Sequence, residues 1–453
     1  MLVCKPSQTN SFFVKFCKSD SIVNTSTPST GENSIHPWRP WLFWGLAALF
    51  YCYGFFQRVA PSVMIDDLMR DFAVSAALLG NLSAFYFYAY AGLQLPVGIA
   101  LDRFGPRRVL AIMAGCCGFG SLLFGIASDL ETAYLGRLLI GAGAAFTWVG
   151  ALKVAATWFP PHRFALISGL TMMLGMGGAI GGQGPLAALV GSVGWRDTMV
   201  GAAALAFILA ILIYLVVRDT PDKVKDAPAP KPDQGPSILG GLAQVTRNSQ
   251  TWWIGLFGAM MTAPMLSFGG LWGVPFMMRS YGLERPQAAF SISLLMLGWA
   301  LGGPFVGWLT DRIGRRRLPM IVCALSALMT MSCLIYFPGL PALGAYILLF
   351  LNGFASGSMV ISFATVREHN RTNVAGVALA FANMMVMSTG AFFQPFIGAL
   401  LDLSWNGTII EGARYYELSD FKTAFIVLPA CGVMALIAAI FTRETYCRPI
   451  HQE

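Results

Sequence analysis

Long apolar runs, separated by short polar stretches, dominate the pattern of residues along this chain. A membrane-crossing helix needs about 20 predominantly apolar residues. Runs of that length predict helices at 41–64, 76–101, 109–128, 132–157, 165–191 and 198–217, and then at 252–277, 287–310, 318–337, 342–366, 374–401 and 422–442. The expected fold class is an all-α polytopic membrane protein with twelve transmembrane helices in two six-helix halves.

Polar stretches suggest the domain boundaries. Residues 1–38 are rich in Ser and Thr, and the stretch around 221–236 is rich in proline, which favours an extended tether over a packed domain. We therefore expect a cytoplasmic tail at 1–38, a first half at 39–217 and a cytoplasmic linker at 218–250. A second half at 251–443 and a cytoplasmic C-terminal tail at 444–453 complete the chain.

Composition supports a membrane protein. Apolar residues make up 56% of the 453 residues and charged residues 11%, against about 25% charged in soluble domains. These values exclude a soluble enzyme, a disordered chain and a nucleic-acid-binding module. The net charge of +8 comes largely from arginines in loops on the side of the N-terminus, which places both termini in the cytoplasm. We expect a multi-pass protein of a bacterial inner membrane that needs only the lipid bilayer around it and functions as a monomer.

The nine cysteines are not spaced like metal ligands or a disulfide framework. Most lie inside apolar runs, where cysteine behaves as a small buried hydrophobic residue. No His, Asp or Glu cluster falls within a predicted span. We therefore expect no cofactor, no metal and no enzymatic activity.

One motif occurs twice, once in each half. Gly98, Asp102 and Arg103 follow the second apolar run, and Gly307, Asp311 and Arg312 follow the eighth in the same register. Glycine allows close helix packing, and an aspartate can cap or pair at a helix end. A duplicated six-helix unit is the architecture of alternating-access carriers.

The repeated motif resembles the signature loop of the major facilitator superfamily, G-x-L-x-D-R-x-G-R-(R/K). The second copy matches it throughout, whereas the first has Ala100 for Leu and Pro106 for a basic residue. The resemblance implies charge-relay contacts that latch one conformation. It assigns this role to Gly98, Asp102, Arg103, Arg107, Gly307, Asp311, Arg312 and Arg316. Alternatively, the arginines are topology anchors only.

A second resemblance runs from Arg137 through Lys153 to Trp158-Phe159-Pro160. This spacing is similar to the anion:cation symporter branch of the superfamily, which contains phthalate- and hexonate-permease-like carriers. That branch commonly has an Asp-Arg pair in helix 1 and a Glu early in helix 4. Here those positions read Gln57-Arg58 and Ala144, so the branch's proton-coupling acids cannot be transferred to this chain.

Three cations lie inside the predicted spans, and ionisable residues there are functional candidates. Arg58 suits bidentate recognition of a carboxylate or phosphate. Lys153 either assists as a ligand or extends its ammonium group to the cytoplasmic surface. Arg137 is expected to be a structural charge that braces neighbouring helix backbones.

Polar side chains add further candidates for the substrate site. Tyr86, Tyr90 and Gln94 follow at intervals of four and share one helical face. Asn352, Asn383 and Gln394 lie within the tenth and eleventh runs. Each of the six either contacts substrate or water, or holds helices together by hydrogen bonds.

These patterns predict a secondary active transporter that moves a small organic anion of the carboxylate type by alternating access. Symport, exchange and uniport remain open at this point. One alternative is a carrier or exporter of neutral or cationic solutes in which Arg58 and Lys153 are structural. Another is a transport-inactive sensor on the same fold.

Overall fold

The computed structural model describes residues 38–160, 163–219, 238–337 and 339–450, all within the unit Trp38–Glu453. The predicted N-terminal tail and most of the predicted linker lie outside these ranges. Each of the twelve predicted runs coincides with helix, and the only strands in the described ranges form a short hairpin. The predicted fold class, an all-helical membrane protein, is confirmed.

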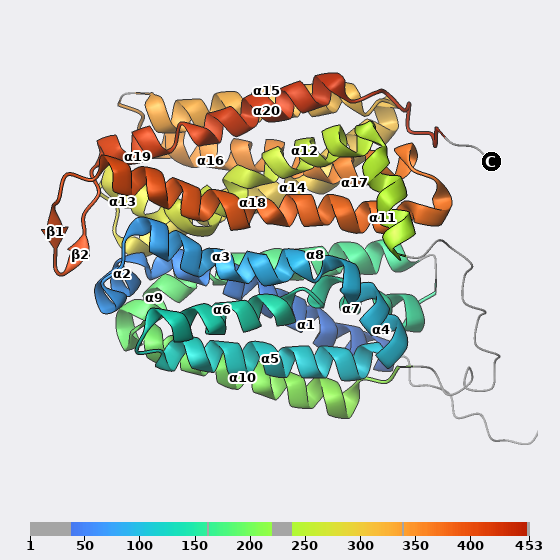
Figure 1. Cartoon of the computed structure of the whole chain (residues 1–453), viewed down its shortest axis with the longest axis horizontal. Coiled ribbons are helices and arrows are strands. Elements are labelled where there is room, and N and C mark those ends of the chain that lie inside the picture. Colours follow the sequence, from blue (N-terminus) through green and yellow to red (C-terminus); the bar gives the residue numbers. More distant parts are fainter. Residues whose placement is uncertain (1–37, 161–162, 220–237, 338, 451–453) are drawn as a thin grey trace, which may run out of the picture. The chain divides into compact units, whose positions relative to one another are not determined.

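The first half contains the helices before the linker, blue to green in Figure 1. They are α1 (Arg39–Val59), η1 (Ala60–Val63), α2 (Ile65–Phe72), α3 (Ala76–Gly92), α4 (Gln94–Phe104), α5 (Pro106–Ile126), α6 (Leu130–Ala144), α7 (Thr147–Trp158), α8 (Phe164–Gly181), α9 (Gly184–Val193) and α10 (Trp195–Val216).

The second half is yellow to red in Figure 1. After α11 (Ile238–Arg247) come α12 (Ser249–Pro264), the π-helix η4 (Met265–Trp272), α13 (Gly273–Tyr281), α14 (Arg285–Ile313), α15 (Arg317–Tyr336), α16 (Ala342–Ser356), η5 (Gly357–Met359), α17 (Val360–His369), η6 (Thr372–Val374) and α18 (Ala375–Ser404). The hairpin β1 (Ile409–Ile410) and β2 (Ala413–Arg414) leads to α19 (Leu418–Ala424) and α20 (Val427–Phe441).

Ten helices in the described ranges are long and apolar enough to cross a membrane, or eleven if the bent pair α2–α3 counts as one span. The remaining predicted span is α1, which has 21 residues. Its tyrosines, tryptophans, Gln57 and Arg58 lower its mean hydropathy. The predicted run 41–64 is also interrupted, because Pro61 lacks the N–H that would continue the α-helical ladder, and the chain tightens into η1.

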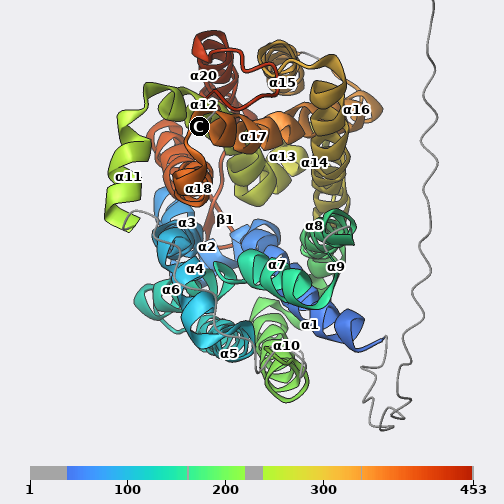
Figure 2. The same ribbon diagram turned by 90° about the vertical axis from the view of Figure 1, so that its right-hand side faces the viewer.

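The most extensive helix contacts between the halves are that of α3 with α18 and that of α14 with α8 and α9. Figure 2 shows both pairs as neighbours. The first contact is close because glycines face backbone. A Cβ on Gly80 would collide with the carbonyl of Gln394, and one on Gly398 with that of Ala76.

The duplicated motif forms equivalent turns between α4 and α5 and between α14 and α15. Gly105 has φ +79° and Gly314 has φ +70°, a backbone conformation that glycine adopts without a Cβ clash. We call the end of the helices that carries these two turns the motif end. The opposite end, which carries α2 and the β1–β2 hairpin, is the hairpin end.

Candidate functional site

The candidate site centres on Arg58, in the last turn of α1. Its guanidinium carbon lies 4.2 Å from the ring centre of Phe55, 5.7 Å from that of Tyr86 and 5.2 Å from that of Tyr90. Aromatic faces attract cations at these distances, and the C-terminal turn of a helix favours a positive charge. The cation therefore sits among rings from α1 and α3 rather than beside an acid.

Arg58 is 6% exposed and has no ion pair in the described part of the chain. Its Nε donates a hydrogen bond to the Tyr86 hydroxyl at 3.4 Å. In the described part of the chain, the two terminal nitrogens donate no hydrogen bond, and neither is fully enclosed by protein atoms. Their donors are therefore free, which suits a bidentate anion.

Tyr86 links Arg58 to a second cation. Its hydroxyl donates to the Gly54 carbonyl at 3.2 Å, and its ring centre lies 5.2 Å from the Arg137 guanidinium carbon. Arg137 donates to the carbonyls of Gln57 at 2.8 Å and Ser83 at 3.4 Å. Arg137 thus bonds to backbone carbonyls of α1 and α3, and its structural role stays a prediction.

The Gln57 side chain is turned toward α5 and away from the predicted substrate site. Its Nε2 donates to the Tyr53 hydroxyl at 2.6 Å and to Ser121 Oγ at 2.8 Å, and the residue is fully buried. An acid at this position would meet Tyr53 and Ser121 first. Although Gln57 and Arg58 are adjacent in the sequence, their side chains contact different helices: Gln57 contacts α5, and Arg58 contacts α3.

Gln94 and Asn383 come together, although they belong to different halves. Asn383 Nδ2 donates to Gln94 Oε1 at 2.6 Å, joining α18 to α4, and Gln94 Nε2 donates to the Tyr90 carbonyl at 3.2 Å. Tyr90 stacks on Tyr86 with ring centres 5.9 Å apart. A chain of hydrogen bonds and stacked rings therefore runs from the surroundings of Arg58 to the second half.

The other two amides make contacts between helices of the second half. Asn352 donates to the Ala327 carbonyl at 2.9 Å and to Thr330 Oγ1 at 3.0 Å. Gln394 Nε2 donates to the Leu266 carbonyl at 2.8 Å. Both arrangements correspond to the helix-bridging alternative for these residues.

In the first motif copy, Lys153 on α7 forms an ion pair with Asp102 at the end of α4. Both side chains are substantially exposed, at 38% and 68%. Arg107 donates from Nε to the Tyr214 carbonyl at 2.7 Å, and its backbone N–H donates to Asp219 at 2.7 Å. Arg103 lies over the ring of Phe104 at 5.5 Å.

In the second copy, Arg316 lies between two acids. It contacts Asp311 at 2.7 Å and Glu368 at 2.8 Å. Burial alone would lower the pKa of Arg316, but the bonds to Glu368 and Asp311 raise it. Arg312 is not part of this network and lies over the Trp308 ring at 5.3 Å.

The close packing expected at the motif glycines is absent in this conformation. A Cβ on Gly98 would meet open space, and one on Gly307 would meet only Val360, at 3.9 Å. The neighbouring aspartates Asp102 and Asp311 form their ion pairs with residues of their own halves.

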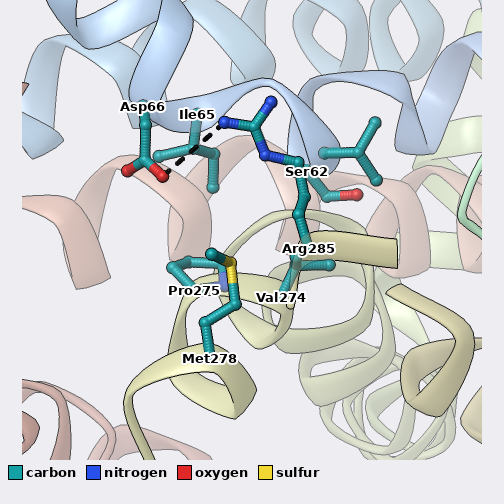
Figure 3. A pocket seen from close by; sticks show the side chains of 8 residues that line it. Ser62, Ile65, Asp66, Val274, Pro275, Met278 and Arg285 are labelled. Carbon is teal, nitrogen blue, oxygen red and sulfur yellow. Dashed lines mark ion pairs between the residues drawn. The ribbon is translucent and has the colours of Figure 1, made fainter. Parts of the chain in front are cut away.

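Sequence reasoning missed two contacts between the halves at the hairpin end. The first joins Arg285 to Asp67 at 2.7 Å and to Asp66 at 4.0 Å. Figure 3 shows Arg285 and Asp66 beside a small pocket that Ser62 and Pro275 also line. No sequence signal pairs these residues, because each lies in a short polar stretch far from the other in the chain.

The second contact centres on Asp402 at the end of α18. Its carboxylate accepts the backbone N–H groups of Ala76 at 3.2 Å and Ala77 at 2.9 Å, at the start of α3. Tyr416 donates to the same carboxylate at 2.6 Å, and Arg414 pairs with it at 3.2 Å. Burial and the nearby Asp402 raise the pKa of Tyr416, so its hydroxyl remains a donor. An acid of the second half thus caps a helix of the first.

Comparison with known proteins places the chain among transporters. The family model described as Major Facilitator Superfamily matches residues 45–395. The chain is 24% identical over 281 residues to a probable sulfoacetate transporter of Cupriavidus necator, covering 60% of this chain and 65% of that protein. It is 25% identical to an oxalate:formate antiporter of Oxalobacter formigenes, covering 90% and 96%.

A solved structure has the same fold. It is a bacterial homologue of the human lysosomal transporter Spinster, with a TM-score of 0.70 at 18% identity, covering 90% of this chain and 96% of that one. The match to the sulfoacetate transporter spans less than two thirds of that relative's length. At such identities, the likeness to the solved structure concerns the fold alone.

Proposed function

Because this chain belongs to the Major Facilitator Superfamily, whose members are secondary transporters and not enzymes, we propose that it carries a small organic anion across the membrane. The substrate binds through a carboxylate or sulfonate to Arg58. Relatives named as transporters of sulfoacetate and of oxalate and formate support an anionic substrate. In this proposal the motif end faces the cytoplasm of a bacterial cell, across its inner membrane. The carrier functions as a monomer and belongs to the anion-transporting branch of the superfamily.

The observation that carries this proposal is the unpaired guanidinium of Arg58. A buried charge is costly unless it is paired and hydrogen-bonded. Here aromatic faces and one hydroxyl satisfy part of the group, and the two terminal nitrogens keep their donors free. An anion would supply the missing partner. Tyr90 and the Gln94–Asn383 pair lie near enough to orient the rest of the molecule.

The distribution of contacts between the halves supports alternating access. Among the described residues, the ion pairs that join the halves lie at the hairpin end, between Arg285 and the aspartates of α2. The motif-end pairs Lys153–Asp102 and Arg316–Glu368 each stay within one half. The conformation is therefore closed toward the outside, and the motif residues are the candidate latch of the opposite state.

Uptake into proteoliposomes tests the proposal. The purified full chain would be reconstituted, and uptake of labelled glucuronate and oxalate measured with sulfoacetate and tartrate as competitors. Arg58→Gln removes the bidentate donor and should lower uptake at least about tenfold, on the order of 1.4 kcal/mol. Arg247→Gln, which changes an exposed arginine on α11, is the matched control and should leave uptake unchanged.

Methyl esters of the same acids separate this function from transport of neutral solutes. The dimethyl ester of tartrate keeps the carbon skeleton of that competitor but carries no charge, and the methyl ester of glucuronate is likewise neutral, so neither should compete. The proposal is wrong if the esters compete as well as the free acids, or if Arg58→Gln transports like the unchanged protein.

A further inference from the structure

The charge balance inside the membrane bears on the mode of transport. Every carboxylate within a described helix lies within two residues of an end of that helix, including Asp102, Asp311, Glu368 and Asp402. The described interior has no acid at mid-depth but keeps its cations. Arg58 is among them although it lies near the end of α1, because it contacts Tyr86 and Tyr90 well inside α3. No group there can cancel a positive charge by losing or gaining a proton at a carboxylate.

The three interior cations, Arg58, Arg137 and Lys153, differ in the partners that stabilise their positive charge. Arg137 is 1% exposed and donates to two backbone carbonyls. Lys153 is paired with Asp102. Arg58 alone among them has neither a carboxylate nor a carbonyl partner in the described residues. The titratable groups around it are the phenols of Tyr51, Tyr86 and Tyr90, which are neutral donors at ordinary pH.

Closing the site at both ends is necessary when a carrier passes from one orientation to the other. In the empty protein, this step removes water from the terminal nitrogens of Arg58 and provides no counter-charge, which carries a large desolvation cost. In the loaded protein, one carboxylate or sulfonate neutralises the guanidinium through two hydrogen bonds. The loaded carrier therefore has the lower barrier.

We infer that this carrier is an anion exchanger, in which Arg58 prevents the empty protein from changing its orientation. The inference rests on the proposed function and adds the coupling mode. Each half-cycle must carry an anion, so inward movement of one anion requires outward movement of another. Neither a proton gradient nor an empty return step drives the cycle.

Exchange assays in proteoliposomes test the inference with the labelled anion that the uptake experiment identifies, either glucuronate or oxalate. Vesicles would contain either the same anion in unlabelled form or no anion. Equal potassium concentrations on both sides, together with valinomycin, would hold the membrane potential at zero. We expect uptake at least about tenfold faster into preloaded vesicles, and no stimulation by an inward proton gradient. Equal uptake into empty vesicles, or uptake driven by the proton gradient, would overturn exchange. Absence of uptake under every condition would instead reject the proposed function.

A second readout follows the orientation of the protein without measuring transport. Ser62 lines the pocket behind the Arg285 contact and is 1% exposed. In a background without the nine native cysteines, Ser62→Cys reports opening of the hairpin end through its rate of thiol labelling. Saturating anion should raise this rate at least about tenfold. With Arg58→Gln added, the anion-free rate should rise to the same level, because the uncompensated charge is gone. The inference is wrong if the Ser62→Cys protein with Arg58 intact is labelled as fast without the anion as with it.

Discussion

Arg58 is a cation inside the membrane whose surroundings are aromatic rather than acidic. Its position could be predicted from the sequence, because an arginine within an apolar run is rare and conspicuous. The rings that enclose it could not be predicted, because Tyr86 and Tyr90 belong to α3. The spacing of residues along α1 does not indicate which helix packs against Arg58. The helical face of Tyr86, Tyr90 and Gln94 was predicted as a unit, and the structure brings all three to the surroundings of Arg58.

Tyr86 orients Arg58 under our proposal, because its hydroxyl accepts from Nε and donates to the Gly54 carbonyl. Tyr86→Phe should raise KM for the anion about fivefold while the maximal rate changes little, which corresponds to about 1 kcal/mol for one hydrogen bond. Tyr88→Phe is the matched control on the same helix. Its hydroxyl donates to Asn81 in an exposed position, so its KM should stay unchanged. Equal changes in KM for Tyr86→Phe and Tyr88→Phe would show that Tyr86 does not contribute to the substrate site.

Helical elements were more predictable than individual contacts. Each apolar run became helix, because a backbone in lipid must satisfy its own hydrogen bonds. The breaks within spans were harder to predict. Pro61 ends the α-helical ladder of α1, and Gly184-Pro185 begins α9 after a break, whereas Pro304 lies inside the continuous helix α14. Proline alone therefore does not show where a span is interrupted, because neighbouring helices can support the freed backbone groups.

The start of α15 depends on a residue from the far end of the chain. Glu444 accepts the backbone N–H groups of Arg316 at 2.7 Å and Arg317 at 2.9 Å, and Asp219 accepts that of Arg107 at the equivalent place in the first half. An acceptor at a helix N-terminus contributes about 1 kcal/mol. Sequence reasoning assigned Glu444 to a tail, since a cap supplied from a distant segment leaves no local pattern.

The pH dependence of this cap follows from its charge. Burial would raise the pKa of Glu444, but the bonds from Arg316, Arg317 and neighbouring N–H groups lower it overall. A lowered pKa in the folded state means that the carboxylate stabilises the fold above its unfolded pKa, near 4.3. That contribution disappears as pH falls through the folded pKa.

Thermal unfolding in detergent should therefore separate Glu444→Gln from the unchanged protein. The variant should unfold a few degrees lower at pH 7, and the difference should shrink below about pH 4. Glu411→Gln, in the exposed β1–β2 hairpin, serves as the control and should show no difference at either pH. A deficit for Glu444→Gln that is the same at both pH values would show that the carboxylate charge is not responsible.

At the scale of the whole molecule, the relation between the halves was the least predictable feature. The duplicated motif indicated two related units, but contacts between them depend on the orientation that the carrier adopts. In this conformation, α18 meets α3 and the aspartates of α2 meet Arg285. The motif residues on which sequence reasoning concentrated bond within their own halves. A sequence pattern shared by both orientations cannot specify which set of contacts is formed.

Asp402 is the residue through which this orientation can be tested. Its carboxylate caps α3 from the opposite half and also binds Tyr416 and Arg414. Opening of the hairpin end must break the bonds to α3, so Asp402→Ala should favour the state that is open at the hairpin end. We expect its population to increase on the order of tenfold, or about 1.4 kcal/mol. Distances between spin labels on the two halves at the hairpin end would measure the shift.

Asp197→Ala is the matched control for this experiment, because Asp197 is an exposed carboxylate at the hairpin end of α10 and makes no described contact with the second half. It should leave the distances unchanged. Tyr416→Phe removes one donor to Asp402 and one acceptor of the Ala76 N–H, while the bonds of Asp402 to α3 remain. It should therefore produce a smaller shift in the same direction. The expected order of the shifts, with Asp402→Ala largest and Asp197→Ala absent, holds only if the Asp402 carboxylate links the two halves. Equal distance distributions in Asp402→Ala and Asp197→Ala would mean that the Arg285 ion pairs and helix packing hold the hairpin end closed without Asp402.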